Sequence, residues 1–115
     1  MAHRILLVED EVAIRSLAAR ALRLEDYEVT EASDGFEAWG IAKMSRFELV
    51  ITDTHMPRLG GSEFVARVRD IHPTVPVLRI CGSHYHGPQE IGVQTLFKPF
   101  TIDELTQMVS LMLAN

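Results

Sequence analysis

Cysteine is nearly absent from this sequence of 115 residues, where Cys81 is the only one. A disulfide needs two cysteines, so an internal disulfide framework is excluded. A single thiol is typical of proteins kept in a reducing compartment. The sequence therefore predicts a fold held together by its own core, in a cytosolic protein.

Long apolar runs are missing as well. The first five residues, MAHRI, contain too short an apolar run for a signal peptide. No later stretch approaches the roughly 20 apolar residues that a membrane-spanning helix needs. We therefore expect a cytoplasmic protein with no membrane partner.

Basic residues are too few and too scattered for nonspecific binding of nucleic acid. Lysine and arginine number 11 against 16 aspartates and glutamates, which gives a net charge of -5 and a pI near 5.4. An anionic protein needs a local basic patch to hold phosphates, and no dense Lys/Arg cluster occurs. We expect no direct nucleic-acid partner.

The composition that remains is that of an ordinary globular domain, with 47% hydrophobic and 23% charged residues. A chain of this length fits one domain and can bury a stable core. No linker, repeat or low-complexity run interrupts it. We therefore expect a single domain over residues 1–115, with no output domain behind it.

Short apolar runs alternate with helical patterns along the chain. The strands are expected at 5–8, 27–32, 47–52, 75–80 and 95–97, and the helices at 12–24, 36–44, 64–71 and 101–112. The segment 81–92, which is rich in Gly, Pro and His, is expected to form at most a turn or two of helix. Such alternation predicts an α/β fold, with a parallel sheet and helices on both faces.

Acidic residues follow two of these strands directly. The run 49–52 stops at Asp53, and the run 5–8 stops at Glu9 and Asp10. Ligands of open α/β sheets bind at the carboxyl edge of the strands, which favours a functional role for Asp53. The alternative is that Asp53 caps a turn, because Asp is among the commonest turn residues.

A basic residue, Lys98, follows the last strand and would meet these acids if the strands are neighbours. Close carboxylates repel each other by about 4 kcal/mol per pair at intermediate dielectric, so a cation is needed. Mg²⁺ suits such oxygen ligands and leaves positions for water or phosphate. Lys98 could pair with an acid or with a phosphoryl oxygen. The set is typical of phosphoryl chemistry, with Asp53 as the nucleophile.

The chain resembles the receiver domains of bacterial two-component response regulators over essentially its whole length. The resemblance is carried by VEDE at 8–11, DTHMP at 53–57 with Gly61 eight residues beyond Asp53, and KPF at 98–100. These motifs are weak singly and specific together, in this order and spacing. The resemblance implies a flavodoxin-like, doubly wound five-stranded parallel sheet in the order 2-1-3-4-5.

The resemblance also implies a metal site for Mg²⁺ or Mn²⁺. Asp10 and Asp53 would ligate the ion directly, Glu9 would contribute through water, and His55 would offer its backbone carbonyl.

Phosphotransfer is the function that the resemblance implies. Asp53 would accept a phosphoryl group from a histidine kinase or a histidine phosphotransfer protein, as in a phosphorelay. Lys98 and the backbone of Thr54 would bind that group, together with the atypical Cys81. A cis peptide bond is implied between Lys98 and Pro99. The downstream protein has no signature in the sequence.

The sequence departs from the family in its switch region. Receivers carry Thr or Ser where this chain has Cys81, and a thiol is a much weaker donor than a hydroxyl. The aromatic switch residue of the family is replaced by Thr95. The connection from Cys81 to Lys98 is also shorter, by about a turn of helix or more. We therefore hypothesise a non-standard output, in which phosphorylation orders the segment 83–92.

Other interpretations of the same residues remain open. His84 and His86, with Cys81 nearby and His55 across the sheet edge, could bind a soft metal, although surface histidines are the simpler interpretation. A redox role for Cys81 would need a depressed thiol pKa, which nearby carboxylates oppose.

Two other function classes compete with the phosphoacceptor. A degenerate receiver would act as a binding module without phosphorylation, but the acids and Lys98 are all retained. An aspartyl-nucleophile hydrolase would need a second acid two residues after Asp53, where this chain has His55. We expect no enzyme activity beyond Mg²⁺-dependent self-phosphorylation and self-dephosphorylation.

Overall fold

The computed structural model describes residues 2–56, 59–82 and 91–114. Strands and helices alternate as far as β4, as the periodicity predicts, and β5 is the next described element. The elements are β1 (Arg4–Val8), α1 (Val12–Leu24), β2 (Glu28–Ala32), α2 (Gly35–Met44), β3 (Leu49–Asp53), α3 (Gly61–Ile71), β4 (Val77–Gly82), β5 (Val93–Lys98) and α4 (Ile102–Leu113).

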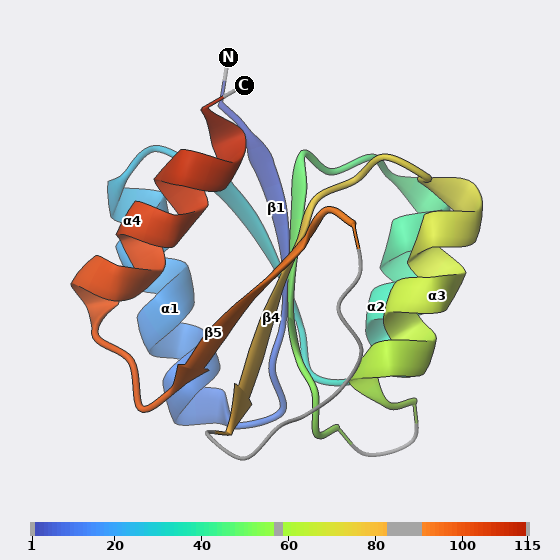
Figure 1. The fold of residues 1–115 in the computed structure, drawn as a ribbon, viewed down its shortest axis with the longest axis horizontal. Coiled ribbons are helices and arrows are strands. Elements are labelled where there is room, and N and C mark those ends of the chain that lie inside the picture. Colours follow the sequence, from blue (N-terminus) through green and yellow to red (C-terminus); the bar gives the residue numbers. More distant parts are fainter. Residues whose placement is uncertain (1, 57–58, 83–90, 115) are drawn as a thin grey trace.

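The five strands form one parallel sheet in the order β2-β1-β3-β4-β5, which confirms the predicted topology. Helices α1 and α4 cover one face, and α2 and α3 cover the other (Figure 1). This order places β1 and β3 side by side at the centre of the sheet. The residues that follow these two strands therefore meet at one edge.

The core consists of two clusters, one on each face of the sheet. Successive residues of a strand point to opposite faces. Leu6 and Val8 accordingly pack with α2 and α3, whereas Ile5 and Leu7 pack with α1 and α4. The central strand β3 is buried at all five positions because helices cover both of its faces.

Some predicted strand boundaries are wrong. The strand predicted at 75–80 is β4, which begins two residues later because Pro76 has no N–H to donate to the ladder. The strand predicted at 95–97 is longer, since β5 pairs with β4 from Val93 to Lys98. Asp53 is the last residue of β3 rather than the first residue after it.

Side-chain caps fix the starts of two helices. Asp34 accepts a hydrogen bond from the backbone N–H of Glu37 at the start of α2. Thr101 and Glu104 form the predicted capping box of α4. The short helix expected within 81–92 would occupy residues 83–90, which lie outside the described residues.

The two chain ends lie together at the amino edge of the sheet, opposite the carboxyl ends of the strands (Figure 1). His3 and Ala114 line the same cavity there. None of the helices in the described part of the chain is both long and apolar enough to cross a bilayer.

Candidate functional site

Asp53 ends β3 with both carboxylate oxygens engaged, although the residue is only 3% exposed. Its Oδ1 accepts a hydrogen bond from the backbone N–H of His55 at 2.8 Å. Its Oδ2 accepts one from Nζ of Lys98 at 2.6 Å. A buried carboxylate with these two donors is held in a fixed orientation, and its charge is balanced by the ammonium group.

Lys98 reaches Asp53 across the end of β4. The strand order puts β5 two strand spacings from β3, which is about 10 Å. The residue of β4 in register with Lys98 is Gly82, which has no side chain. The Lys98 ammonium group also lies 3.4 Å from Oε1 of Glu9. It therefore contacts acids from two strands. The Lys98–Pro99 peptide bond is cis, as the resemblance implies.

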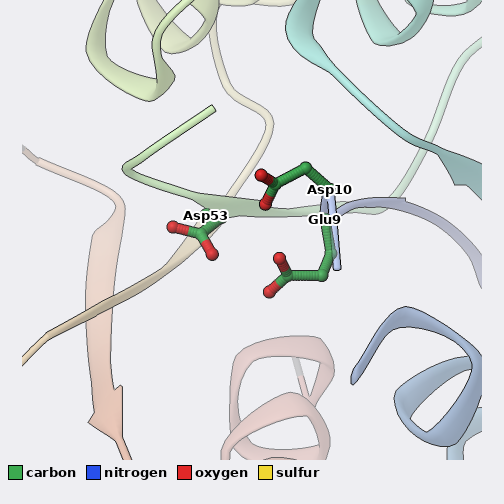
Figure 2. Close-up of side chains that lie close together, drawn as sticks. All are labelled: Glu9, Asp10 and Asp53. Carbon is green, nitrogen blue, oxygen red and sulfur yellow. The ribbon is translucent and has the colours of Figure 1, made fainter. Parts of the chain in front are cut away.

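Glu9 and Asp10 complete a group of three carboxylates. Glu9 is 1% exposed, and its backbone N–H donates to the carbonyl of Ala32 in β2 at 3.1 Å. Asp10 is exposed. One oxygen from each of Glu9, Asp10 and Asp53 lies within 4.8 Å of the others. Figure 2 shows the three carboxyl groups gathered around a common space.

Burial and neighbouring charges shift the pKa values of two groups in the site. Burial, with the charge of Asp53 and contact with Asp10, raises the pKa of Glu9 to about 7. Burial lowers the pKa of Lys98, but the hydrogen bond and charge of Asp53, together with Glu9, outweigh it and raise that pKa overall. Lys98 therefore stays charged, while Glu9 has an unusually high affinity for a proton.

This donor set fits a hard divalent cation. Three carboxylates within reach of one point supply the oxygen ligands that Mg²⁺ or Mn²⁺ prefers. Oε1 of Glu9 is buried and makes no hydrogen bond to the described residues, and the Lys98 ammonium group lies 3.4 Å from it. A positive ion in this space would satisfy that oxygen and reduce the repulsion between the carboxylates.

Gly61 allows the start of α3 to pack directly against the end of β3. A Cβ at this position would lie 2.5 Å from the carbonyl oxygen of Asp53 and 2.8 Å from Cα of Thr54. Real side chains do not tolerate such contacts. This close approach gives a physical reason for the glycine in the motif.

The backbone of Thr54, predicted to bind a phosphoryl group, already has a partner. Its N–H donates to the carbonyl of Ile80 at 3.0 Å, continuing the ladder between β3 and β4 by one residue. The backbone N–H that meets the Asp53 carboxylate belongs to His55 instead. The predicted use of the His55 carbonyl as a metal ligand stays a prediction.

The two predicted switch positions lie on β4 and β5. Cys81 is buried in register with Phe97, and burial raises the pKa of its thiol. The reactive thiolate is therefore disfavoured, which argues against a redox role. Thr95 is half-buried in register with Arg79, which is 4% exposed. His84 and His86, considered above as possible ligands of a soft metal, lie outside the described residues.

Sequence reasoning missed one residue that contacts the site. The guanidinium group of Arg15, in α1, donates to the backbone carbonyl of Glu9 at 2.9 Å. The signal was weak, since Arg15 is simply a polar position on an amphipathic helix. Arg15 also donates to Glu31 in β2, a contact that helical periodicity does not predict.

The profile of the response regulator receiver domain family matches residues 5–110. The chain belongs to this family. It is therefore a receiver domain of the kind found in two-component response regulators.

Individual relatives place the same domain in longer proteins. Over 111 residues the chain is 32% identical to the sensor protein EvgS of Escherichia coli K12, covering 92% of this chain but only 9% of EvgS. It is 43% identical to the receiver domain of the hybrid histidine kinase CckA, with a TM-score of 0.86, covering 96% of this chain and 98% of that one.

A second solved structure shares the receiver fold at lower identity. The receiver domain of sensor histidine kinase PA1611 from Pseudomonas aeruginosa PAO1 superimposes with a TM-score of 0.89 at 24% identity, with both chains fully covered. That structure is described as having a magnesium ion coordinated in its active-site cleft.

Proposed function

We propose that this receiver domain accepts a phosphoryl group on Asp53 from a histidine kinase or a histidine phosphotransfer protein, in a reaction that requires Mg²⁺. The observation that carries the proposal is the contact of Asp53 with Lys98 at 2.6 Å, next to the carboxylates of Glu9 and Asp10. The acceptor, the cation-binding acids and the basic partner therefore lie within one small space.

Each residue of the site has a distinct role in this proposal. Asp10 and Asp53 would hold the metal directly, Glu9 through water, and His55 through its carbonyl. The bound ion would neutralise developing charge on the phosphoryl oxygens. The magnesium described in the PA1611 receiver supports this assignment.

In the transfer step, one carboxylate oxygen of Asp53 forms a bond to phosphorus while the P–N bond of the donor's phosphohistidine breaks. The electron pair of that bond stays on the imidazole nitrogen. Lys98 already holds Oδ2 of Asp53, so its ammonium group can follow the negative charge onto a phosphoryl oxygen. The His55 N–H keeps the other oxygen oriented.

The output of this domain is proposed to differ from the usual receiver switch. At the position where a hydroxyl would bond the phosphoryl oxygen, Cys81 offers only a weak donor. Thr95 has no ring to rotate inward. Signalling through ordering of the segment 83–92, of which residues 83–90 lie outside the described residues, is the form of output we propose, and a cytoplasmic location belongs to the same proposal.

Labelling with a small phosphodonor tests the proposal. Acetyl phosphate with Mg²⁺ should modify the unaltered chain at one site, which peptide mass spectrometry should map to Asp53. The variant Asp53→Asn should lose the label, and chelation of Mg²⁺ should prevent it. Asp70→Asn is a matched control, because this exposed residue of α3 lies outside the site.

The outcomes separate the candidate functions. Labelling that survives Asp53→Asn would contradict the assignment of the acceptor. No labelling from acetyl phosphate or from a phosphorylated phosphotransfer protein would favour the alternative, a degenerate receiver that binds its partner without phosphorylation.

A further inference from the structure

Arg15 links the acidic loop after β1 to the neighbouring strand β2. Its Nη1 donates to the backbone carbonyl of Glu9 at 2.9 Å, and its Nε donates to Oε1 of Glu31 at 3.3 Å. The Arg15 side chain is only 17% exposed. A guanidinium group can make both contacts because its donors point in fixed directions from one plane.

The carbonyl that Arg15 holds has a particular place in the site. It belongs to the peptide group between Glu9 and Asp10, the two acids that β1 contributes. The N–H of Glu9 is fixed on the other side by the carbonyl of Ala32. A rotation of this peptide would swing the Asp10 carboxylate relative to that of Glu9, and the Arg15 contact opposes it.

Few other contacts in the described chain hold this loop. The residue before α1, Glu11, makes no side-chain capping bond to the helix. Its backbone N–H donates to Oε2 of Glu9 at 3.2 Å, a contact that fixes the side chain of Glu9 and not the peptide that follows. The guanidinium group therefore provides the contact that orients the Glu9–Asp10 peptide plane.

Glu31 is itself anchored by a second arginine. Nη1 of Arg23 lies 3.2 Å from Oε2 of Glu31, and Nη2 of Arg23 donates to the carbonyl of Val29 at 2.9 Å. Arg23 thus shares the Glu31 carboxylate with Arg15 but does not touch the acidic loop. The chain supplies a control residue of the same type, on the same helix, with the same partner.

We propose that Arg15 is a positioning residue, which sets the relative orientation of the Glu9 and Asp10 carboxylates for a divalent cation. The inference rests on the proposed metal site, and it assigns to Arg15 no contact with the ion or with the phosphoryl group. Residues that orient metal ligands typically change metal affinity by about 10 to 100-fold when they are removed.

Calorimetric titration of the full chain with Mg²⁺ tests this role without any phosphorylation. Arg15→Gln should weaken Mg²⁺ binding by about 10-fold or more, by analogy with other residues that orient metal ligands. Arg23→Gln removes an equal charge from Glu31 and should leave the affinity within about twofold, because it leaves the Glu9 carbonyl contact in place. Arg15→Lys can donate to that carbonyl and should recover part of the loss.

A metal-free readout accompanies the titration. In amide NMR spectra recorded without Mg²⁺, the Asp10 N–H should shift in Arg15→Gln and stay in place in Arg23→Gln, since that N–H belongs to the peptide group that Arg15 holds. Thermal unfolding of both variants checks that they fold. If Arg15→Gln fails to fold, the comparison of Arg15→Lys with Arg23→Lys decides the question by the same two readouts.

Equal Mg²⁺ affinities and equal Asp10 shifts in the Arg15 and Arg23 variants would overturn the inference. The proposed function fails in a different way. If the unaltered chain binds Mg²⁺ but is never labelled at Asp53, the phosphoacceptor proposal is wrong, while weakened binding in Arg15→Gln still supports the role of Arg15.

Discussion

The two halves of the carboxyl edge are built differently. On the side of β1 and β3, charged groups contact one another across strands, and Lys98 bridges Asp53 and Glu9. On the side of β4 and β5, the predicted switch positions hold Cys81 and Thr95, a buried thiol and a half-buried hydroxyl. The groups proposed to accept a phosphoryl group therefore gather on one side, called the acceptor side below, and the proposed switch positions lie on the other, called the reporting side.

Among the variants considered, replacement of Lys98 should have the largest effect on labelling and stability. In Lys98→Met the carboxylates of Asp53 and Glu9 lose their cation, so labelling by acetyl phosphate should fall by about 100-fold, as when one transition-state donor is removed. The metal-free protein should lose about 2–5 kcal/mol of stability, because a buried charge is left unpaired.

Added Mg²⁺ should raise the melting temperature of Lys98→Met more than that of the unaltered protein, since the ion replaces the missing charge. Lys43→Met is the control, because Lys43 lies over the ring of Trp39 on α2. Labelling that survives in Lys98→Met would show that the acceptor side does not depend on its bridging cation.

Acidification should weaken metal binding through Glu9. The pKa of Glu9 is raised to about 7, mainly by burial, and a carboxyl group must lose its proton to help bind Mg²⁺. Affinity should therefore fall by up to about 10-fold per pH unit below that value. Calorimetry at several pH values measures this, and Mg²⁺ binding near pH 7 should release protons.

The raised pKa of Glu9 has the opposite effect on folding stability, which it increases as the pH falls. Between the unfolded value of 4.5 and about 7, the folded metal-free state binds more protons than the unfolded chain, so this group makes the protein more stable as pH falls through that range. Glu9→Gln should remove both dependences. An affinity for Mg²⁺ that is flat from pH 8 to 6 would contradict the role of Glu9.

Alanine substitution at two glycines tests how closely each side is packed. Gly61→Ala places a methyl group 2.5 Å from the Asp53 carbonyl and should lower stability by about 1–3 kcal/mol, as overpacking does. A methyl group at Gly82, at the end of β4, meets no described atom within 4 Å. Urea unfolding of both variants measures the difference, and equal losses would mean that close packing is not particular to the acceptor side.

Replacement of Cys81 should have the smallest effect. The thiol is a weak donor, so Cys81→Ala should change the labelling rate by less than about twofold. Cys81→Thr supplies a hydroxyl that can bond a charged phosphoryl oxygen and should increase the rate or the lifetime of the label. A large loss of labelling in Cys81→Ala would show that the reporting side takes part in acceptance after all.

The positions of the clustered acids could be predicted because their signal is local. An apolar run that ends in an acid identifies a buried strand and the group at its carboxyl edge, as at Val8–Glu9 and Thr52–Asp53. The order of the strands, which makes these acids neighbours, came from the family resemblance. In that strand order, the Lys98 side chain at the end of β5 extends past β4 to reach Asp53 and Glu9.

What could not be predicted depends on hydrogen bonds that form only when the elements pack together. The N–H of Thr54 is used by Ile80 because the β3–β4 ladder extends one residue past β3. Arg15 of α1 donates both to the Glu9 carbonyl and to the Glu31 carboxylate of β2, which lie 6 and 16 residues away in the sequence. Hydrophobic periodicity carries no information about either bond.

The position of the chain ends has a practical consequence for how this domain can be joined to others. Both ends emerge at the amino edge of the sheet, on the far side from Asp53 (Figure 1). A sequence fused to either end starts away from the acidic edge and leaves it open to a donor. The domain can thus be carried as a module within a longer polypeptide, as its relative within EvgS is, and an affinity tag or fluorophore can be attached at either end for the titrations above.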